Sequence, residues 1–335
     1  MKILHLIDSL EYNGHARQLA LLAPALAEEG VQVEVCCLGP ETPWAMSLRE
    51  AGVPVHILGW TRWFDFSVLW TLREILRDRS FDLIHVWRLP ALRSLAVVAK
   101  GLLPRVVMSE PTPARETMSW WDRRLLHQVH RLPFTGVQKT RRESFLIPKT
   151  TPDPFSWSWQ IACVGKLEHD DGFRQAIWAI DFLRYVYPNA NLKLVGAGSQ
   201  LAVLQALTEG LGNATSVQFL GARADADAVL RDADVVWLPT LANGGRQVAL
   251  EAMALGKPVI ASDVPCLREI LKDGETGFLV PPGNVLQLAR RTRTLCNDAG
   301  LRARIGMAAQ DHVERHFSLA EAVRRWRDFY GAVAA

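Results

Sequence analysis

The chain has 335 residues, of which 49% are hydrophobic, a length at which one hydrophobic core usually gives way to two domains of roughly 150 residues each. The formal net charge of +3 is too small to predict a nucleic-acid partner. No apolar run approaches the roughly 18 residues of a membrane-spanning helix, and Asp8 interrupts the first run before a signal-peptide core forms, so a cytoplasmic protein is expected.

The first half of the chain alternates strand patterns with helix patterns. Apolar runs predict buried strands at 2–7, 31–38, 53–58, 81–87 and 105–110. Apolar residues at helical spacing predict a helix through Gln18, Leu22 and Leu26, and further helices near 66–79, 90–101 and 118–131. Buried strands that alternate with helices are typical of a parallel sheet covered on both faces, so this half is expected to form one α/β domain.

The second half repeats this organisation after a proline-rich stretch, PKTTPDPFSWSW at 148–159, which predicts an interdomain linker. Strands are expected at 159–165, 190–196, 216–221, 233–239, 257–262 and 277–280, and helices near 285–297, 299–315 and 318–333 close the chain. The domains are therefore expected at 1–150 and 151–317, with 318–335 packing back on the first. Two doubly wound domains would face a central cleft between the carboxyl ends of their strands, where ligands of open α/β sheets bind.

No metal site is indicated by the sequence. None of the cysteines lies in a C-x-x-C or Cys/His arrangement with metal-ligand spacing. They are expected to be small core residues. The five are Cys36, Cys37, Cys163, Cys266 and Cys296.

A glycine turn followed by a helix that carries one acid is the strongest candidate site. The stretch TLANGGRQVALEAMALGKPVIAS at 240–262 contains the turn and the helix. Glycines let the backbone approach a ligand, and a helix N-terminus attracts anions, so Gly244, Gly245 and Arg246 suit a phosphate. Glu251 lies about 9 Å further along the helix, where it could accept hydrogen bonds from a ribose. The alternative is a glycine-capped helix whose acid pairs with a neighbouring base.

This stretch resembles the donor-site signature of retaining glycosyltransferases of family 4, which have the GT-B fold. The matching residues are Pro239, Gly244, Leu250 to Ala254, Gly256, Pro258 and the run Asp273 to Gly277. Other segments resemble the family in the same order along nearly the whole chain. They are MKILHLIDSLEYNGHARQ, FDLIHVW, VGKLEHDDGF, KLVGAGSQL, VQFLGAR and ADVVWLPT.

The resemblance implies two Rossmann-like domains, with a nucleoside diphosphate sugar bound mainly by the second and the acceptor by the first. It implies that Glu251 holds the ribose hydroxyls and that Gly244 to Arg246 face the sugar and phosphates. It also implies that Lys166 neutralises the diphosphate and that Gly14 lets the first-domain loop approach it. The implied activity is hexosyl transfer in cell-envelope polysaccharide biosynthesis, with retention, without a cofactor or metal ion, and with a UDP-sugar as donor.

Three positions depart from the family pattern, so its pair of glutamates is degenerate here. The family has a glutamate that contacts the transferred sugar where this chain has Asn243, and a phosphate-binding lysine where it has Asp171. A histidine that ends the fifth strand in many members is replaced by Pro111 or a near neighbour. A carboxylate in place of a phosphate-binding lysine costs on the order of several kcal/mol in a partly buried site. Arg246 could supply the lost positive charge, or could point to solvent and pair with Asp171.

Two polar residues could compensate for the missing groups. Asn243 can still hydrogen-bond sugar hydroxyls, although it carries no charge. His15 could act as an acceptor-side base in place of the missing histidine, or it could be a merely polar loop residue.

The predicted helix near 118–131 lies in a basic region, since residues 115–149 hold eight lysines and arginines against three acids. Trp120, Trp121 and Leu125 fall on one flank of this helix, and Arg123 and Arg124 on another. The helix could lie on an anionic membrane that displays a lipid-linked acceptor. The alternative is an amphipathic helix whose tryptophans pack on the sheet.

The leading interpretation is a hexosyltransferase whose partners are a nucleotide sugar and a glycan, lipid-linked or small-molecule acceptor, with peripheral membrane contact at the inner face of the membrane. The alternative is a catalytically lapsed GT-B protein that binds nucleotide or glycan without turnover. A third interpretation, an epimerase of nucleotide sugars, would need acids and a histidine in the cleft beyond those identified here.

Overall fold

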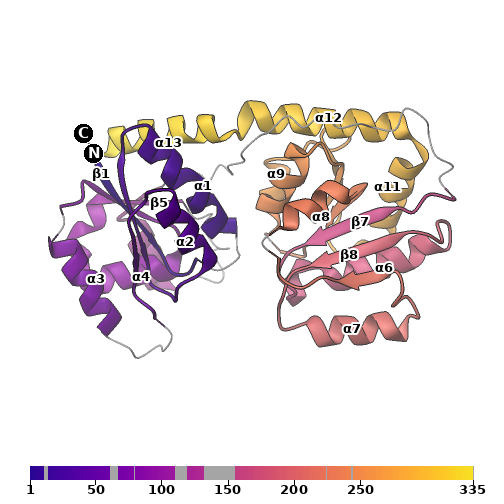
Figure 1. The fold of residues 1–335 in the computed structure, drawn as a ribbon, viewed down its shortest axis with the longest axis horizontal. Coiled ribbons are helices and arrows are strands. Elements are labelled where there is room, and N and C mark those ends of the chain that lie inside the picture. Colours follow the sequence, from indigo (N-terminus) through magenta and orange to yellow (C-terminus); the bar gives the residue numbers. More distant parts are fainter. Residues whose placement is uncertain are drawn as a thin grey trace. The chain divides into compact units, whose positions relative to one another are not determined.

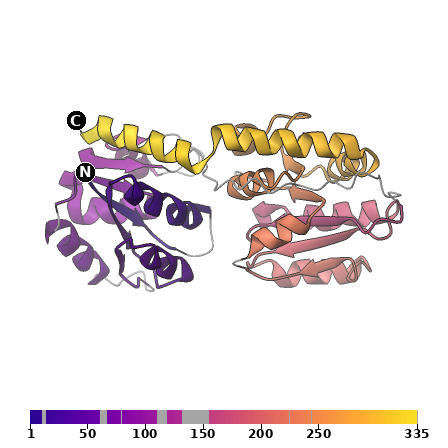
Figure 2. The same ribbon diagram turned by 45° about the horizontal axis from the view of Figure 1, so that its top comes forward.

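The structure is a computed structural model of the chain (Figure 1). It describes residues 1–10, 14–60, 67–78, 80–109, 119–131, 155–223, 225–242 and 244–334. The fold divides into two compact units. Unit 1 comprises Met1–Lys139 and Leu319–Ala335, and unit 2 comprises Thr140–Ser318. Each unit contains one sheet with helices on both of its faces, as Figures 1 and 2 show. No helix within the described ranges is both long enough and apolar enough to cross a membrane.

Unit 1 is built on a six-stranded parallel sheet in the spatial order β3-β2-β1-β4-β5-β6. The strands are β1 (Lys2–Ile7), β2 (Gln32–Cys37), β3 (Val55–Ile57), β4 (Leu83–Val86), β5 (Val106–Met108) and β6 (His130–Arg131). In the register, Ile3 lies between Val33 of β2 and Leu83 of β4. The first three strands extend the sheet in one direction and the next three in the other, so the strand order reverses between β1 and β4.

Helices cover both faces of the unit 1 sheet because successive strand residues point to opposite sides. Ile3 and Ile7 lie in the core under α1, α2 and α13, whereas Leu4 and Leu6 lie in the core under α3, α4 and α5. The helices are α1 (Gly14–Glu28), α2 (Pro43–Glu50), α3 (Ser67–Asp78), α4 (Leu89–Ala99), α5 (Trp120–Leu126) and α13 (Leu319–Ala334). Figure 1 shows α1 and α2 on one side of the sheet and α3 on the other. The doubly wound fold expected for the first half is confirmed.

The helix α13 comes from the end of the chain and completes the core of unit 1, where it packs beside α1 (Figure 2). It buries Trp326 and Tyr330 against His5 of β1 and His85 of β4. The Tyr330 hydroxyl lies 2.6 Å from His85 Nδ1, and Trp87 Nε1 donates to His5 Nδ1 at 3.0 Å. Burial lowers the pKa of His5 to about 3 and that of His85 well below its usual value. The two histidines are therefore neutral parts of the core.

Unit 2 has a second six-stranded parallel sheet, in the order β12-β11-β10-β7-β8-β9. The strands are β7 (Gln160–Val164), β8 (Asn191–Val195), β9 (Val217–Phe219), β10 (Val235–Leu238), β11 (Val259–Ser262) and β12 (Phe278–Val280). Strands β7, β8 and β9 extend the sheet one way, and β10, β11 and β12 the other. The order therefore reverses between β7 and β10.

The helices of unit 2 also divide between two faces. The core that contains Ile161 and Cys163 lies under α6, α7 and α11, and the core that contains Ala162 and Val236 lies under α8, α9, α10 and α12. The helices are α6 (Phe173–Arg184), α7 (Leu201–Gly210), α8 (Ala226–Asp232), α9 (Arg246–Ala254), α10 (Pro265–Arg268), α11 (Val285–Asn297) and α12 (Ala299–His316). Both sheets are thus doubly wound, as the alternating pattern predicts.

The helix expected near 118–131 is shorter in the structure. α5 ends at Leu126, and His130–Arg131 form the strand β6, which pairs with β5. The start of α5 is capped by Ser119, whose hydroxyl oxygen accepts from the Asp122 amide. The Asp122 carboxylate accepts from Arg93 Nε at 2.8 Å and Nη2 at 2.7 Å, and these bonds lower its pKa to about 2. An ion pair between the buried Asp122 carboxylate and the partly exposed Arg93 of α4 therefore fixes the first turn of α5.

Trp121 of α5 is 60% exposed. The interpretation in which both tryptophans of this helix pack on the sheet is therefore wrong for Trp121, while the side chain of Trp120 lies outside the described part. The next residue, Asp122, is buried, so these two neighbouring side chains of the first turn lie in different environments.

The stretch predicted as a linker ends within the core of unit 2. Residues 148–154 lie outside the described ranges, but Trp159 is buried and Trp157 packs against the same core. Trp157 Nε1 also lies 3.4 Å from an oxygen of Asp234. The predicted linker was too long at its carboxyl end, because Trp157 packs partly buried against this core and the predicted strand already begins at Trp159.

Candidate functional site

In unit 2, the carboxyl ends of β7 and β10 meet where the strand order reverses. Ligands of open α/β sheets bind at such a point, because the loops that leave the two strands cross to opposite faces. Leu241 N donates to Asp170 O at 2.7 Å, and the Glu168 carboxylate accepts from Ser199 N at 2.9 Å. Three loops are thereby joined into one edge. The loops are 165–172, 196–200 and 239–245.

The glycine turn lies at this edge and begins α9. Gly245 is the N-cap residue with φ +79°, a left-handed conformation that favours glycine, and it offers no side chain to the first amides of the helix. Gly172, with φ +77°, lies so close to the β10 loop that a β-carbon there would come within 1.9 Å of Pro239 O. The backbones of the two loops are therefore in direct contact, and the positive end of the α9 dipole is at the edge.

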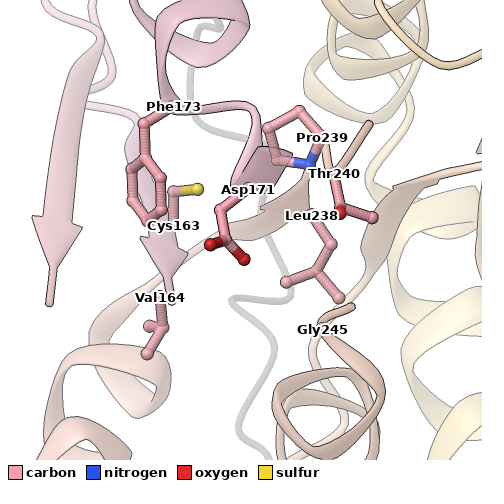
Figure 3. A pocket seen from close by; sticks show the side chains of 8 residues that line it. All are labelled: Cys163, Val164, Asp171, Phe173, Leu238, Pro239, Thr240 and Gly245. Carbon is pink, nitrogen blue, oxygen red and sulfur yellow. The ribbon is translucent and has the colours of Figure 1, made fainter. Parts of the chain in front are cut away.

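Asp171 points into a pocket beside the glycine turn. Figure 3 shows its carboxylate between the side chains from the β7 end and those from the β10 end. A β-carbon built on Gly244 would lie 3.7 Å from Asp171 Oδ1, which places the carboxylate against the turn. Burial raises the pKa of Asp171 to about 6, an effect that Lys166 opposes and Asp170 and Glu168 increase. The lining residues are Cys163, Val164, Asp171, Phe173, Leu238, Pro239, Thr240 and Gly245.

Lys166 and Glu251 lie at different depths of this region. Lys166 follows β7 and is exposed, close enough to Asp171 to favour its ionised form. Glu251 is buried in α9, and its Oε1 accepts from Gln247 Nε2 at 2.8 Å. One hydrogen-bond donor to Glu251 is thus a neutral amide one helical turn away.

Arg246, the first residue of α9, forms an ion pair with Glu269. Its Nη1 also lies 3.4 Å from Cys266 O, and its side chain is largely buried. The alternative in which Arg246 points to solvent and pairs with Asp171 is therefore wrong. The charge of Arg246 is balanced by the segment after α10, which leaves Lys166 as the nearer cation for Asp171.

Gly14 and His15 belong to unit 1, whereas the other candidate residues that the structure describes belong to unit 2. They are the first two residues of α1, so the expectation that they lie in a loop is wrong. The helix starts there because the apolar stripe that packs on the sheet begins at Ala16. Asn243 and Pro111 lie outside the described residues, and their predicted roles stay predictions.

The cysteines fit the prediction of core residues. Cys36, Cys37, Cys163 and Cys296 are buried, and Cys266 is partly buried. Within the described ranges, no group of three or more His, Cys, Asp or Glu side chains is arranged to hold a metal ion.

Two further polar features lie at the strand ends and belong to no sequence motif described above. Thr240 Oγ1 lies 3.0 Å from Asp170 O and 2.9 Å from Ala242 O, so it orders the entry to the glycine turn. In unit 1, Asp8 and Arg88 form an ion pair where that sheet reverses its order. Thr240, Asp8 and Arg88 each follow a predicted strand run directly, and this position is the signal in the sequence that indicates them.

The fold and this edge together define a class, a two-domain α/β protein with an anion-attracting helix N-terminus at a strand reversal. The profile of the Glycosyl transferases group 1 family matches residues 154–312, and that of the Glycosyl transferase 4-like domain matches residues 13–139. A phosphatidyl-myo-inositol mannosyltransferase of Mycobacterium leprae is 36% identical over 332 residues, which cover 88% of this chain and 87% of that relative. The chain belongs to the group 1 glycosyl transferases.

Other relatives match only part of the chain or have a lower sequence identity. A D-inositol 3-phosphate glycosyltransferase of Corynebacterium kroppenstedtii is 30% identical over 179 residues, covering 51% of this chain and 40% of that relative. The structure of Anabaena Alr3699/HepE in complex with UDP and glucose has a TM-score of 0.80 at 20% identity and covers 99% of both chains. The last similarity shows the fold, which is GT-B with two Rossmann-like domains. The central cleft expected between these domains stays a prediction.

Proposed function

We propose that this protein transfers a hexose from a nucleoside diphosphate sugar to an acceptor hydroxyl with retention of the anomeric configuration. The observation that carries the proposal is the glycine turn at the start of α9, with Glu251 buried further along the same helix. The turn suits a diphosphate, and Glu251, about 9 Å away along the helix, suits the ribose of the same nucleotide. Membership of the glycosyl transferases supports the same reaction.

The main task of the donor site is to stabilise the diphosphate as its bond to the sugar carbon breaks. Amides of the Gly244 to Arg246 turn are held in place before the reaction, so they stabilise the new charge without reorganisation. Lys166 adds a positive charge at the same edge. In this proposal the protein groups, rather than a resident metal ion, neutralise the leaving group, and the donor is the only small molecule required besides the acceptor.

The relatives support particular substrates to test first. The Anabaena structure contains UDP and glucose, which supports a UDP-sugar as donor. The Mycobacterium leprae relative is named for mannosyl transfer to phosphatidyl-myo-inositol, which supports a polyhydroxylated, lipid-linked acceptor. A lipid-linked acceptor would require contact with a membrane, and α5 presents the exposed Trp121 beside the exposed Arg123 and Arg124.

One observation favours the second candidate function, a GT-B protein that binds nucleotide without turnover. The Asp171 carboxylate lies against the glycine turn, where it repels a diphosphate when ionised. Its pKa of about 6 leaves it mostly ionised at neutral pH. A donor site weakened in this way would hold the nucleoside end through Glu251 and fail to activate the leaving group.

The two functions are separated by incubating the full chain with UDP-glucose, UDP-galactose, GDP-mannose and ADP-glucose, each with phosphatidylinositol vesicles, oligosaccharides or monosaccharides. Transfer of label to any acceptor, with release of the nucleoside diphosphate, supports the transferase. Binding of UDP in a calorimeter without transfer or hydrolysis, in the wild type and in Asp171→Lys, supports the second function. Absence of binding and of hydrolysis with every donor refutes both.

A further inference from the structure

The sheet of unit 1 carries an ion pair at its own point of strand reversal. Asp8 directly follows β1, and Arg88 follows β4 as the N-cap residue of α4. Arg88 Nη1 donates to Asp8 Oδ2 at 2.9 Å, and the two side chains are 33% and 19% exposed. Since β1 and β4 are neighbours from which the sheet grows in opposite directions, this pair occupies the position in unit 1 that the glycine turn edge occupies in unit 2.

Folding stability is a weak reason for two charges to lie at this edge. A partly exposed ion pair contributes little to stability, because solvent already satisfies both charges in the unfolded chain. Two buried oxygens at the carboxyl ends of β1 and β5, the strands on either side of β4, also lack a partner within the described residues. They are Asp8 Oδ1 and Ser109 Oγ, the latter directly after β5. Neither oxygen forms a hydrogen bond with any residue that the structure describes. Buried polar atoms of this kind are costly, so they point to a partner that arrives with a ligand.

The chemistry of the pair selects the ligand. The Asp8 carboxylate only accepts hydrogen bonds and the Arg88 guanidinium only donates them, whereas a hydroxyl does both. Two adjacent ring hydroxyls can therefore donate to the carboxylate and accept from the guanidinium at once, each through a charge-assisted bond. An anionic group would gain Arg88 but meet the charge of Asp8, so the neutral pair disfavours phosphate.

We propose that Asp8 and Arg88 form a binding site for two adjacent hydroxyls of a neutral polyhydroxylated ring, a pyranoside or a cyclitol, in the acceptor. This inference rests on the proposed function, in which unit 1 supplies the acceptor site. Asp8 and Arg88 bind and orient the ring, and the donor groups remain those of unit 2.

The test measures binding of methyl α-mannopyranoside, of myo-inositol and of inorganic phosphate to the full chain by saturation-transfer NMR and calorimetry. The variants are Asp8→Asn, which keeps the shape of the side chain, and Arg88→Lys, which keeps its charge. The matched control is Glu29→Gln, which removes another ion pair of unit 1, between Glu29 and Arg327 at 2.9 Å. UDP affinity of every variant reports separately on unit 2.

The wild type is expected to bind at least one of the two rings. Asp8→Asn and Arg88→Lys are each expected to weaken that binding about tenfold, because the first removes the charge of the acceptor and the second removes the paired N–H donors of the guanidinium. Glu29→Gln should bind as the wild type does, and UDP affinity should be unchanged in all three. Tighter binding of the mannoside than of inositol would indicate a pyranoside acceptor, and the opposite order would indicate a cyclitol.

Three results would overturn the inference. They are a wild type that binds neither ring, Asp8→Asn and Arg88→Lys variants that bind the ring within twofold of the wild type, and tighter binding of phosphate than of either ring with loss of the phosphate binding in Arg88→Lys. A wild type that binds the ring but no nucleotide would refute the proposed donor function and leave this site standing. A wild type that binds UDP but neither ring would refute this site and leave the proposed donor function standing.

Discussion

Replacing Asp171 by asparagine isolates the cost of an ionised carboxyl at the donor edge. Burial raises its pKa from 3.8 to about 6, which corresponds to about 3 kcal/mol at about 1.4 kcal/mol per pH unit. The carboxyl is only half-buried, so solvent screening reduces the effect. We expect Asp171→Asn to raise the free energy of unfolding at pH 7 by about 1 to 2 kcal/mol.

The pH dependence gives the sign of this effect. Between pH 3.8 and about 6 the unfolded Asp171 has lost its proton while the folded one keeps it, so the stability of the wild type falls as the pH rises through this interval. The variant lacks this fall, so the two proteins should converge towards pH 4 and differ fully above pH 7.

Urea unfolding followed by circular dichroism, from pH 4 to pH 8, measures both quantities. The control is Asp170→Asn, which makes the same chemical change at a side chain that is 75% exposed, and should alter the free energy of unfolding by less than about 0.5 kcal/mol. A variant Asp171→Asn that is no more stable than the wild type at pH 7, or that loses stability as steeply between pH 4 and 6, would refute the reasoning.

Four further outcomes are expected. Asp171→Lys should tighten UDP binding at least tenfold in calorimetry, because a charge at about 4 Å is worth on the order of 4 kcal/mol at intermediate dielectric, and unchanged affinity would contradict a phosphate beside this residue. Glu251→Gln should weaken UDP binding about tenfold but leave pyrophosphate binding unchanged, and equal effects on both ligands would argue against a ribose contact. Tyr330→Phe removes the hydrogen bond to His85 and should lower the free energy of unfolding by about 1 to 2 kcal/mol in urea. Trp121→Ala should reduce co-sedimentation with anionic vesicles without changing the melting temperature, since the side chain is exposed, and undiminished sedimentation would remove α5 from the membrane proposal.

The doubly wound sheets were predictable because their strands are buried on both sides. In the run KILHLI, Ile3 and Ile7 enter one core and Leu4 and Leu6 the other. Apolar residues therefore occur on both faces of the strand, and this pattern distinguishes it in the sequence from a half-exposed strand, in which apolar and polar residues alternate. The length of α5 was not predictable in this way. Its apolar spacing continues past Leu126, but pairing of β6 with β5 takes the following residues into the sheet.

The candidate site was predictable where local backbone chemistry defines it. Two glycines before a helix indicate a turn with an open N-terminus, and Gly245 has the positive φ that this requires. The partner of Arg246 was not predictable, since Glu269 lies 23 residues further on and reaches it only through the placement of α10. The raised pKa of Asp171 likewise depends on burial by two loops that are distant in the sequence.

The position of α13 has a consequence for the order in which the protein is made. Trp326 and Tyr330 belong to the core of unit 1, yet they are synthesised after every residue of unit 2. On the ribosome, unit 2 can therefore finish folding first. The face of unit 1 that carries His5 and His85 stays uncovered until α13 emerges. Nascent chains that stop before α13 should expose that face to chaperones, although they already contain a complete second sheet.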